Sequence, residues 1–346
     1  MAMTKRARFE SSCPGVFFLD EYDLDALKVY LQNQGWLTGN ESLRAASKPG
    51  EGNMNYTLRV ETSTRGMILK QARPWVEKYD DIAAPSERAV VEGRFYQLIE
   101  QIPALQARMP RLLGFDSHSR LLMLEDVGTG SDYTGLYTGE ALTSEELEML
   151  VNFLITLHTS FLGFNQDGQF SNQAMRQLNH QHIFKIPLDP ENGLDLDSIT
   201  PGLSESAVEL SKDSDYANAV LELGKLYLQT GNSLLHGDFF PGSWLHSESG
   251  PRIIDPEFCF FGPPEFDFGV LVGHLHLSNQ STELIDRTLQ AYSVSCSNLP
   301  KSTKLLQQFA GVEIMRRLIG VAQLPISLDL GRKQELLTQS RRLVCS

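Results

Sequence analysis

The sequence is poor in cysteine and contains no long apolar run. Four of its 346 residues are cysteines, at positions 13, 259, 296 and 345, and their spacing matches neither a CxxC motif nor a set of metal ligands. A chain of this length buries enough apolar surface to fold without disulfides. No segment approaches the roughly 20 apolar residues of a membrane span, and the apolar stretch at 16–19 is too short for a signal peptide. We therefore expect a cytoplasmic protein with reduced thiols.

Positive charge is also scarce. The chain has 30 lysine and arginine residues against 43 aspartate and glutamate residues, a formal charge of −13. This balance repels nucleic acid backbones and anionic membranes, so we expect neither as a partner. The hydrophobic share of 41% and the charged share of 21% are those of an ordinary globular protein. The length allows two lobes and a substantial core.

Residues 1–125 are predicted to form the smaller, sheet-rich lobe. Tyr56, Leu58 and Val60 alternate with polar residues, which predicts paired strands within 50–72 and a turn at 63–66. A helix should follow Pro85, capped by Ser86. Its apolar stripe would contain Val91, Phe95, Leu98 and Ile102, with Glu92 at the edge.

Residues 126–346 are predicted to form a larger, mostly helical lobe. Thr143 and Glu146 have the spacing of a capping box. The segment 186–204, rich in proline, glycine and aspartate, predicts a loop, and a helix is expected at about 205–230. The fold class is therefore α+β: a small antiparallel sheet with one main helix, then a helical lobe with one embedded hairpin.

That hairpin lies in the stretch LLHGDFFPGSWLHSESGPRIIDPEF, which begins at Leu234. Its pattern predicts a loop, a strand, a tight turn and a second strand. Asp238 would lie at the entrance of the hairpin and Asp255 at its exit, so we expect the two carboxylates to be neighbours. Two neighbouring carboxylates usually have a cation or a proton between them.

Other charged residues occur in an order that suits phosphoryl transfer from ATP. The loop GEGNMN could hold phosphate oxygens with its backbone amides, and its candidate residues are Gly50, Gly52, Asn53 and Asn55. Lys70, on the second strand after this loop, would neutralise the nucleotide phosphates. Glu92 would hold that lysine in an ion pair. On the hairpin, Asp238 would accept a hydrogen bond from the substrate hydroxyl and orient it for attack.

The same pattern predicts a magnesium site. Asp255 would bind Mg²⁺, which takes oxygen ligands and commonly one or two carboxylates together with phosphates. Glu257 would be a second ligand if the chain stays extended through Pro256, because residues two apart on a strand point the same way.

These segments resemble those of a known superfamily. HGDFFPGSWL followed by IIDPEF is similar to the catalytic and metal-binding segments of the aminoglycoside phosphotransferase and choline kinase superfamily. Within it, GEGNMN, LKQARP, the segment Ile254 to Pro263 and MRRLIG resemble methylthioribose kinases. Ser243 stands where most of the superfamily has asparagine, and methylthioribose kinases are similar in having serine there.

The resemblance implies a bilobal, protein-kinase-like fold with a nucleotide-binding lobe at 1–125 and a catalytic, substrate-binding lobe at 126–346. It implies ATP and Mg²⁺ as cofactors, with Ser243 at the metal site, and a sugar-like alcohol, 5-methylthioribose, as the substrate. Adenine would lie against the hinge near Glu125 and Val127. Arg316 and Arg317 would contact substrate hydroxyls, and the protein would be a homodimer.

Some alternatives remain open. Phe239 and Phe240 replace the leucine and histidine that are usual after the aspartate, and these positions lie beside the acceptor hydroxyl. Another small alcohol or an aminoglycoside is therefore an alternative acceptor, and an inactive nucleotide-binding module is an alternative function. Arg316 lies on an apolar helix face, so its partner is either an internal carboxylate or the substrate. Arg317 could form a surface ion pair with Glu313.

The resemblance also implies that Asp267 accepts backbone hydrogen bonds that brace the catalytic loop, as the similar aspartate of the superfamily does. His236 would be a scaffold residue that bonds backbone near this loop, and His158 would be a satisfied core histidine.

Overall fold

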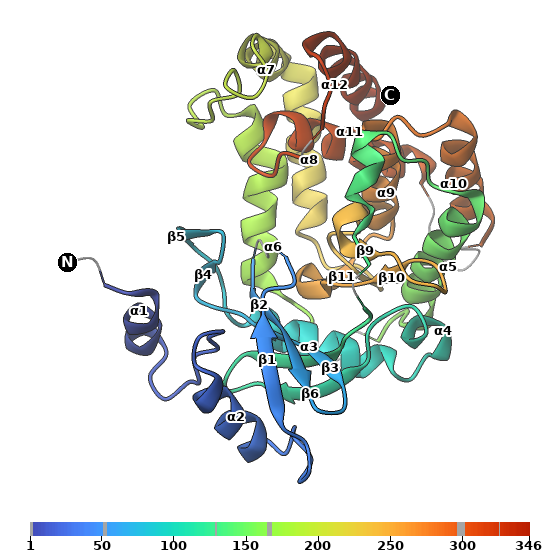
Figure 1. Ribbon diagram of the computed structural model, residues 1–346. Coiled ribbons are helices and arrows are strands. Elements are labelled where there is room, and N and C mark those ends of the chain that lie inside the picture. Colours follow the sequence, from blue (N-terminus) through green and yellow to red (C-terminus); the bar gives the residue numbers. More distant parts are fainter. Residues whose placement is uncertain (1–2, 51–53, 129, 165–167, 296–301, 325) are drawn as a thin grey trace. The chain divides into compact units, whose positions relative to one another are not determined.

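In the computed structural model of the protein, residues 3–50, 54–128, 130–164, 168–295, 302–324 and 326–346 are described (Figure 1). The chain divides into two compact units, residues 1–129 and 130–346, where the sequence predicted a division after residue 125. The functional role of each unit stays a prediction. In the part of the chain that the structure describes, no helix combines the length and the apolar composition needed to cross a bilayer.

The first unit is built on an antiparallel sheet of five strands. Their order across the sheet is β1 (Leu43–Ser47), β2 (Tyr56–Thr62), β3 (Gly66–Gln71), β7 (Leu121–Glu125) and β6 (Leu112–Asp116). The predicted alternation on β2 is confirmed, since Tyr56, Leu58 and Val60 are buried on one face. The strand β3, which carries Lys70, is the central strand.

The two faces of this sheet are covered by different helices. Helix α2 (Leu24–Asn33) packs its apolar side on the face that carries Leu58 and Leu69. Lys70, one residue after Leu69, points to the opposite face, because side chains alternate along a strand. There it meets helix α3 (Arg88–Ile99), the predicted main helix of this unit.

The start of α3 differs from the prediction. The helix begins at Arg88, its N-cap residue is Glu87, and no side chain caps it. The predicted cap, Ser86, instead donates its hydroxyl hydrogen to Glu87 Oε2. The sequence did not predict helices α1 (Lys5–Ser12), α2 and α4 (Pro103–Gln106), nor the small hairpin of β4 (Trp75–Val76) and β5 (Tyr79–Ala83).

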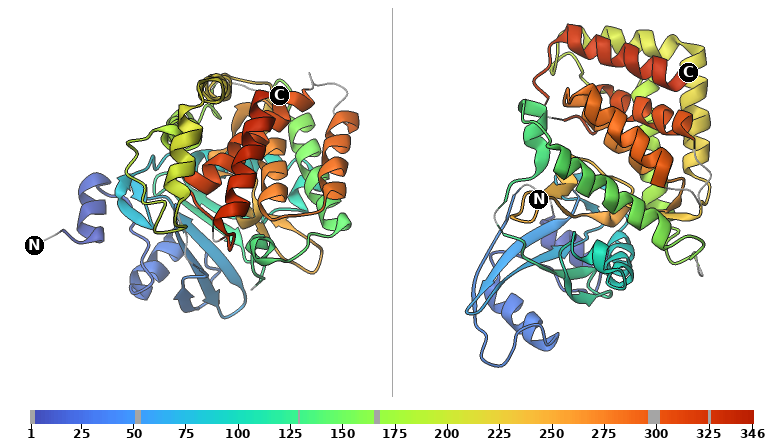
Figure 2. Two further views of the ribbon diagram at one scale, coloured as in Figure 1. Left: turned by 90° about the horizontal axis from the view of Figure 1, so that it is seen from above. Right: turned by 90° about the vertical axis from the view of Figure 1, so that its right-hand side faces the viewer.

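The second unit is mainly helical, as predicted (Figures 1 and 2). Its α-helices are α5 (Ser144–Ser160), α6 (Gln173–His180), α7 (Leu203–Lys212), α8 (Ser214–Tyr227), α9 (Glu265–Leu277), α10 (Thr282–Ser295), α11 (Thr303–Ile319) and α12 (Leu330–Cys345). Short helical turns are η1 (Tyr133–Thr138), η2 (Gln181–Lys185), η3 (Ile186–Leu188), η4 (Pro241–Ser243) and η5 (Pro256–Phe258). The predicted hairpin is confirmed: β9 (Trp244–Leu245) pairs with β10 (Arg252–Ile253), and a second small sheet joins β8 (Ser233–Leu235) to β11 (Phe260–Gly262).

Two local predictions for this unit have different outcomes. The capping box of Thr143 and Glu146 is present at the start of α5. The single helix expected at about 205–230 is wrong, because the chain forms α7 and α8 with a break at Asp213. The Asp213 side chain accepts a hydrogen bond from the backbone N–H of Tyr216 and caps the second helix.

Helices α9 and α11 pack closely against each other. Gly269 and Gly273, one turn apart on α9, both face α11. A Cβ atom at Gly269 would lie 2.5 Å from Phe309 Cβ, and one at Gly273 would lie 2.9 Å from Glu313 Cβ. The absence of side chains at these two positions lets the helices approach and brings polar residues of α9 next to those of α11.

Candidate active site

Lys70 and Glu92 form a buried ion pair within the first unit. Lys70 Nζ lies 2.8 Å from Glu92 Oε1, and the two residues are 4% and 1% exposed. Because Lys70 is on the central strand, it is not the solvated edge lysine that strands usually carry. A buried ion pair contributes little net stability, since desolvation offsets its Coulomb energy. This pair therefore suits a role in which the lysine is held in one position for a ligand.

The predicted phosphate loop is described at its two ends. Gly50 and Asn55 lie within the described residues, whereas Gly52 and Asn53 lie outside them. Arg88 on α3 donates from Nε to Asn55 Oδ1 at 2.9 Å and from Nη2 to the carbonyl of Met54 at 2.8 Å. The helix that carries Glu92 therefore also anchors the end of this loop. The side chain of Asn55 contributes to that anchor, and its role in nucleotide binding stays a prediction.

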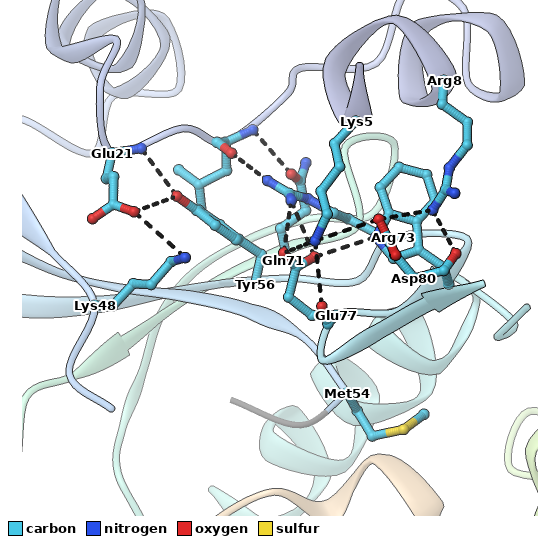
Figure 3. Close-up of polar contacts among 12 residues, drawn as sticks. Lys5, Arg8, Glu21, Lys48, Met54, Tyr56, Gln71, Arg73, Glu77 and Asp80 are labelled. Atoms are coloured by element: carbon cyan, nitrogen blue, oxygen red, sulfur yellow. Dashed lines mark hydrogen bonds and ion pairs between the residues drawn. The ribbon is translucent and has the colours of Figure 1, made fainter. Parts of the chain in front are cut away.

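The residues that follow Lys70 support the first unit. Gln71 is fully buried and connects the sheet to the N-terminal segment, accepting from Leu19 N at 2.9 Å and donating to the carbonyl of Phe17 at 2.6 Å. Arg73 donates to the carbonyl of Leu19 at 2.7 Å. It also donates to Glu77 at 3.0 Å, and Figure 3 shows these two side chains together. The motif LKQARP thus combines one candidate functional residue, the lysine, with two anchors.

Glu125 and Val127, the predicted hinge, lie at the end of β7 and just beyond it. The backbone N–H of Glu125 donates to the carbonyl of Arg111 at 2.9 Å, and its carboxylate accepts from Arg111 N at 3.1 Å. Asp126 between them is held by Arg59, whose Nε lies 2.8 Å from Asp126 Oδ2. The segment is fixed by its own strand neighbours, and its contact with adenine stays a prediction.

In the second unit, Asp267 braces the loop that carries Asp238. This carboxylate, on α9, accepts hydrogen bonds from the backbone N–H of His236 at 2.7 Å and of Gly237 at 3.0 Å. It also lies 3.0 Å from His158 Nε2. The predicted role of Asp267 is confirmed, and the bracing fixes the backbone just before Asp238. His158 is a core histidine, as predicted, but it is satisfied only at Nε2, because its buried Nδ1 has no hydrogen-bond partner among the described residues.

Gly237 allows the chain to turn at this point. Its φ angle is +87°, and a Cβ atom here would lie 2.2 Å from the carbonyl oxygen of Phe258. Only glycine adopts such a conformation without strain. The turn presents Asp238 directly after the braced backbone.

The hairpin carries Asp238 and Asp255 at its two ends, as predicted, and His236 connects them. Its Nε2 lies 2.9 Å from the carbonyl oxygen of Ile254, the residue before Asp255. Burial lowers the pKa of His236, while the negative charges of Asp238 and Asp255 both act to raise it. Both carboxylates therefore lie around the same imidazole ring.

The predicted metal ligands are Asp255, Glu257 and Ser243. The argument for Glu257 assumed an extended chain through Pro256, and this is wrong: Pro256–Phe258 forms a helical turn, and Asp255 has a φ of 61°. Ser243 instead closes the hairpin, since its Oγ donates to the carbonyl of Asp238 at 3.1 Å and its carbonyl accepts from Ile254 N at 2.9 Å. Whether any of the three binds a metal stays a prediction.

The donor chemistry of this region nevertheless fits Mg²⁺. The available groups are carboxylate and hydroxyl oxygens, which are the ligands of hard cations. Within the described ranges, no group of three His, Cys, Asp or Glu side chains converges as a complete metal cage. Mg²⁺ is commonly bound by one or two carboxylates together with substrate phosphates, so a complete cage is not required.

Arg316 and Arg317 both bind Asp238. Arg316 Nη2 lies 2.9 Å from Asp238 Oδ1, and Arg317 Nη2 lies 3.2 Å from the same oxygen. Each also donates from Nε to Glu313, at 2.5 Å from Arg316 and 2.7 Å from Arg317. The partners of Arg316 are thus internal carboxylates. The alternative pairing of Arg317 with Glu313 is present, but its expected place at the surface is wrong, because both residues are buried.

The charges of this group are balanced. Burial alone would raise the pKa of Glu313, but the two guanidinium groups hold that pKa well below its ordinary value, Arg316 more strongly than Arg317. Burial alone would lower the pKa of Arg316, but Glu313 and Asp238 together raise it. Two cations thus face two carboxylates. The Asp238 side chain is 21% exposed and accessible to a ligand, whereas that of Glu313 is 2% exposed.

Phe239 and Phe240 have different environments. Phe239 is fully buried and packs among Phe153 and Trp244, so it belongs to the core. Phe240 is partly exposed, and its ring lies beneath Arg317, with the guanidinium carbon 4.5 Å from the ring centroid. Of the two departures from the superfamily pattern, only Phe240 contacts the arginine pair.

The sequence signalled Glu313 only as a helical neighbour of the arginines, three and four residues before them.

Known proteins resemble this chain in sequence and in fold. A model of the phosphotransferase enzyme family matches residues 46–306. A methylthioribose kinase from Exiguobacterium sibiricum is 26% identical over 249 residues, which cover 69% of this chain and 62% of that protein. One from Bacillus cereus is 26% identical over 339 residues, covering 86% of this chain and 84% of that protein.

Solved structures share the fold at lower identity. A choline kinase from Cryptosporidium parvum Iowa II is 15% identical, with a TM-score of 0.54 over 93% of this chain and 96% of that chain. A choline kinase from Streptococcus pneumoniae is 13% identical, with a TM-score of 0.51 over 93% of this chain and 99% of that chain. The predicted bilobal, protein-kinase-like fold is thereby confirmed.

Proposed function

This chain belongs to the phosphotransferase enzyme family, and from that premise we propose that it is a kinase that transfers the γ-phosphoryl group of ATP to a hydroxyl of a sugar-like alcohol. We propose 5-methylthioribose as the acceptor, because the proteins named methylthioribose kinase align with 86% of this chain. The observation that carries the proposal is the placement of Asp238, which follows a loop braced by Asp267 and is held by two arginines.

Asp238 would accept a hydrogen bond from the acceptor hydroxyl and orient its oxygen for in-line attack on the γ-phosphorus. Both arginines bind Asp238 Oδ1. Among the residues that the structure describes, the hydrogen bonds to this carboxylate all go to Oδ1 and none goes to Oδ2. We assign Oδ2 to the acceptor hydroxyl. The remaining N–H groups of Arg316 and Arg317 would bind neighbouring hydroxyls of the sugar.

The nucleotide would be bound mainly by the first unit. We assign the phosphates to Lys70, positioned by Glu92, and to the loop residues Gly50, Gly52, Asn53 and Asn55. Adenine would contact the segment of Glu125 and Val127. Asp255 would hold Mg²⁺, with Glu257 and Ser243 as further candidates, and the ion would neutralise charge on the phosphates.

The arginine pair distinguishes this proposal from a kinase for cationic acceptors. Choline and aminoglycosides are cations, and cation sites usually present carboxylates or aromatic faces. Here two guanidinium groups lie against Asp238, so a cationic acceptor would meet like charge. A neutral polyol would instead accept hydrogen bonds from them. An inactive nucleotide-binding module remains the alternative from another class.

The test is ADP release with methylthioribose, compared with ribose and choline. We expect turnover with methylthioribose and a loss of about 10²–10⁴-fold in kcat for Asp238→Asn, with ATP affinity retained. Asp286→Asn, an exposed aspartate on α10, is the matched control and should turn over normally. ATP binding without ADP release for any alcohol would favour the inactive module, and preference for choline would favour a cationic acceptor.

Two predictions about the whole molecule accompany this function. We propose that the enzyme is cytoplasmic and that it forms a homodimer. Light scattering on the purified protein measures its molar mass and so tests the homodimer directly.

A further inference from the structure

A buried chain of hydrogen bonds leads away from the arginine pair. His274 Nε2 lies 2.9 Å from Glu313 Oε1, and His274 Nδ1 lies 2.7 Å from Tyr137 Oη. All three residues are at most 5% exposed. No part of the proposed chemistry uses His274 or Tyr137, so their placement calls for a separate account.

The direction of each hydrogen bond can be assigned. Burial lowers the pKa of His274 to about 4, although the hydrogen bond to Glu313 acts in the opposite sense. The imidazole is therefore neutral near neutral pH and donates from one nitrogen only. An ionised carboxylate only accepts, so His274 donates from Nε2 to Glu313 and accepts at Nδ1 from the hydroxyl of Tyr137.

Glu313 is consequently held from several sides. Its Oε1 accepts from His274 and from Arg317 Nε, and its Oε2 accepts from Arg316 Nε. Side chains at positions i+3 and i+4 of a helix lie near that of residue i. Glu313 thus binds the Nε side of each guanidinium group, and the Nη2 atom of each is left to reach Asp238.

We propose that Glu313, with its orientation fixed by His274 and Tyr137, is a positioning residue that sets the geometry of the acceptor site. This inference rests on the proposed function, in which Asp238 and the arginine pair bind the acceptor hydroxyls. Without Glu313, two guanidinium groups would share a single carboxylate. They would compete with the acceptor for Asp238, because Glu313 is the group that holds both Nε atoms among the residues described.

The sharpest test removes one hydroxyl group. Tyr137→Phe deletes the donor to His274 and leaves every group at the acceptor site in place. Tyr216→Phe is the matched control, because Tyr216 is also buried and its Oη lies 2.7 Å from Ser340 Oγ. For Tyr137→Phe we expect kcat/KM for the acceptor to fall by about 5-fold, the equivalent of one hydrogen bond, with KM for ATP unchanged. Tyr216→Phe should leave both parameters unchanged.

A second variant tests Glu313 itself. Glu313→Gln keeps the shape of the side chain and removes its charge. We expect kcat/KM for the acceptor to fall by about 100-fold, because the interactions lost are charged and buried. ATP binding, followed by calorimetry, should be retained.

The outcomes separate this inference from the function on which it rests. Wild-type protein that releases no ADP with any acceptor overturns both. Wild-type turnover together with a Tyr137→Phe variant that matches Tyr216→Phe in all kinetic parameters overturns the positioning role alone. A fall in kcat with both KM values unchanged in Tyr137→Phe also overturns it, because a smaller fraction of folded enzyme lowers the apparent kcat and leaves KM for ATP and for the acceptor as they were.

Discussion

The guanidinium group of Arg317 lies over the ring of Phe240, with its carbon 4.5 Å from the ring centroid. A cation over an aromatic face gains about 0.5–1 kcal/mol at a partly exposed site. Phe240 is thereby assigned a role that its position in the sequence did not reveal. The ring supports one of the two arginines that bind Asp238.

Replacing Phe240 with leucine should weaken acceptor binding. The variant keeps an apolar side chain but removes the aromatic face, so we expect KM for the acceptor to rise by about 2–5-fold. Phe240→Tyr retains the face and is the control. Steady-state kinetics with the acceptor varied at saturating ATP measures the difference. Identical KM values for the two variants would contradict a role for the cation–π contact.

Lys70 and Glu92 allow stability and activity to be separated. Lys70→Ala removes the charge that compensates a buried carboxylate, and we expect a loss of about 3–5 kcal/mol in the free energy of unfolding. The double variant Lys70→Met, Glu92→Leu removes both charges and should recover most of that stability. It should nevertheless bind ATP poorly, since it lacks the group assigned to the phosphates.

The control for this pair is Lys225→Met. Lys225 forms an ion pair with Glu222 in which both side chains are about two-thirds exposed, and exposed pairs contribute only about 0–1 kcal/mol. Denaturant unfolding and ATP titration measure the two quantities. A double variant that binds ATP normally would remove Lys70 from the proposed site.

Gly237 and Gly139 form a matched pair for the conformation of the catalytic loop. Both have positive φ angles, but a Cβ atom at Gly237 would collide with the Phe258 carbonyl, whereas one at Gly139 would meet no atom within 4 Å. Gly139→Ala should cost about 1 kcal/mol of stability from backbone strain and leave kcat unchanged. Gly237→Ala should cost more and lower kcat, because the loop must move to remove the collision. Equal effects of the two substitutions on kcat would contradict this account.

Short sequence patterns correctly predicted several elements of secondary structure. The alternation on β2, the capping box of α5 and the hairpin around Trp244 each depend on residues a few positions apart. The sequence did not reveal the helix break at Asp213, where one aspartate caps a new helix in an otherwise continuous apolar pattern. The prediction of an extended chain through Pro256 to Glu257 is wrong, because Asp255 adopts a left-handed conformation that the sequence does not indicate.

Parts of the candidate site could be predicted from the sequence, because a buried charged residue needs a partner and the sequence pattern also indicates that partner. The order of charged residues predicts the pair of Lys70 and Glu92, whereas the role of Asp267 follows from the resemblance to the superfamily. The network behind the arginines was not predictable. Glu313 and His274 are 39 residues apart, and His274 and Tyr137 are 137 apart, so only the close packing of α9 on α11 brings the first two together.

The same network predicts how stability depends on pH. The pKa of His274 falls from 6.5 to about 4 on folding, mainly through burial. Between these values the unfolded chain binds more protons at this residue than the folded protein does, so stability falls as the pH drops. We expect His274 to account for a loss of about 3 kcal/mol across that window. Folding also lowers the pKa of Glu313, so this residue contributes to the loss of stability in acid only below about pH 4.5, where the unfolded chain begins to bind its proton.

Urea unfolding between about pH 4.5 and 7.5 measures this effect, because it follows the free energy of unfolding through the window where only histidines titrate. The variant His274→Gln has no group that titrates there, so its free energy of unfolding should fall less steeply with acid than that of the wild type. His118→Gln, at an exposed histidine, should keep the wild-type slope. If all three proteins shared one slope, His274 would not be held neutral by burial, and the direction assigned to its hydrogen bonds with Glu313 and Tyr137 would be wrong.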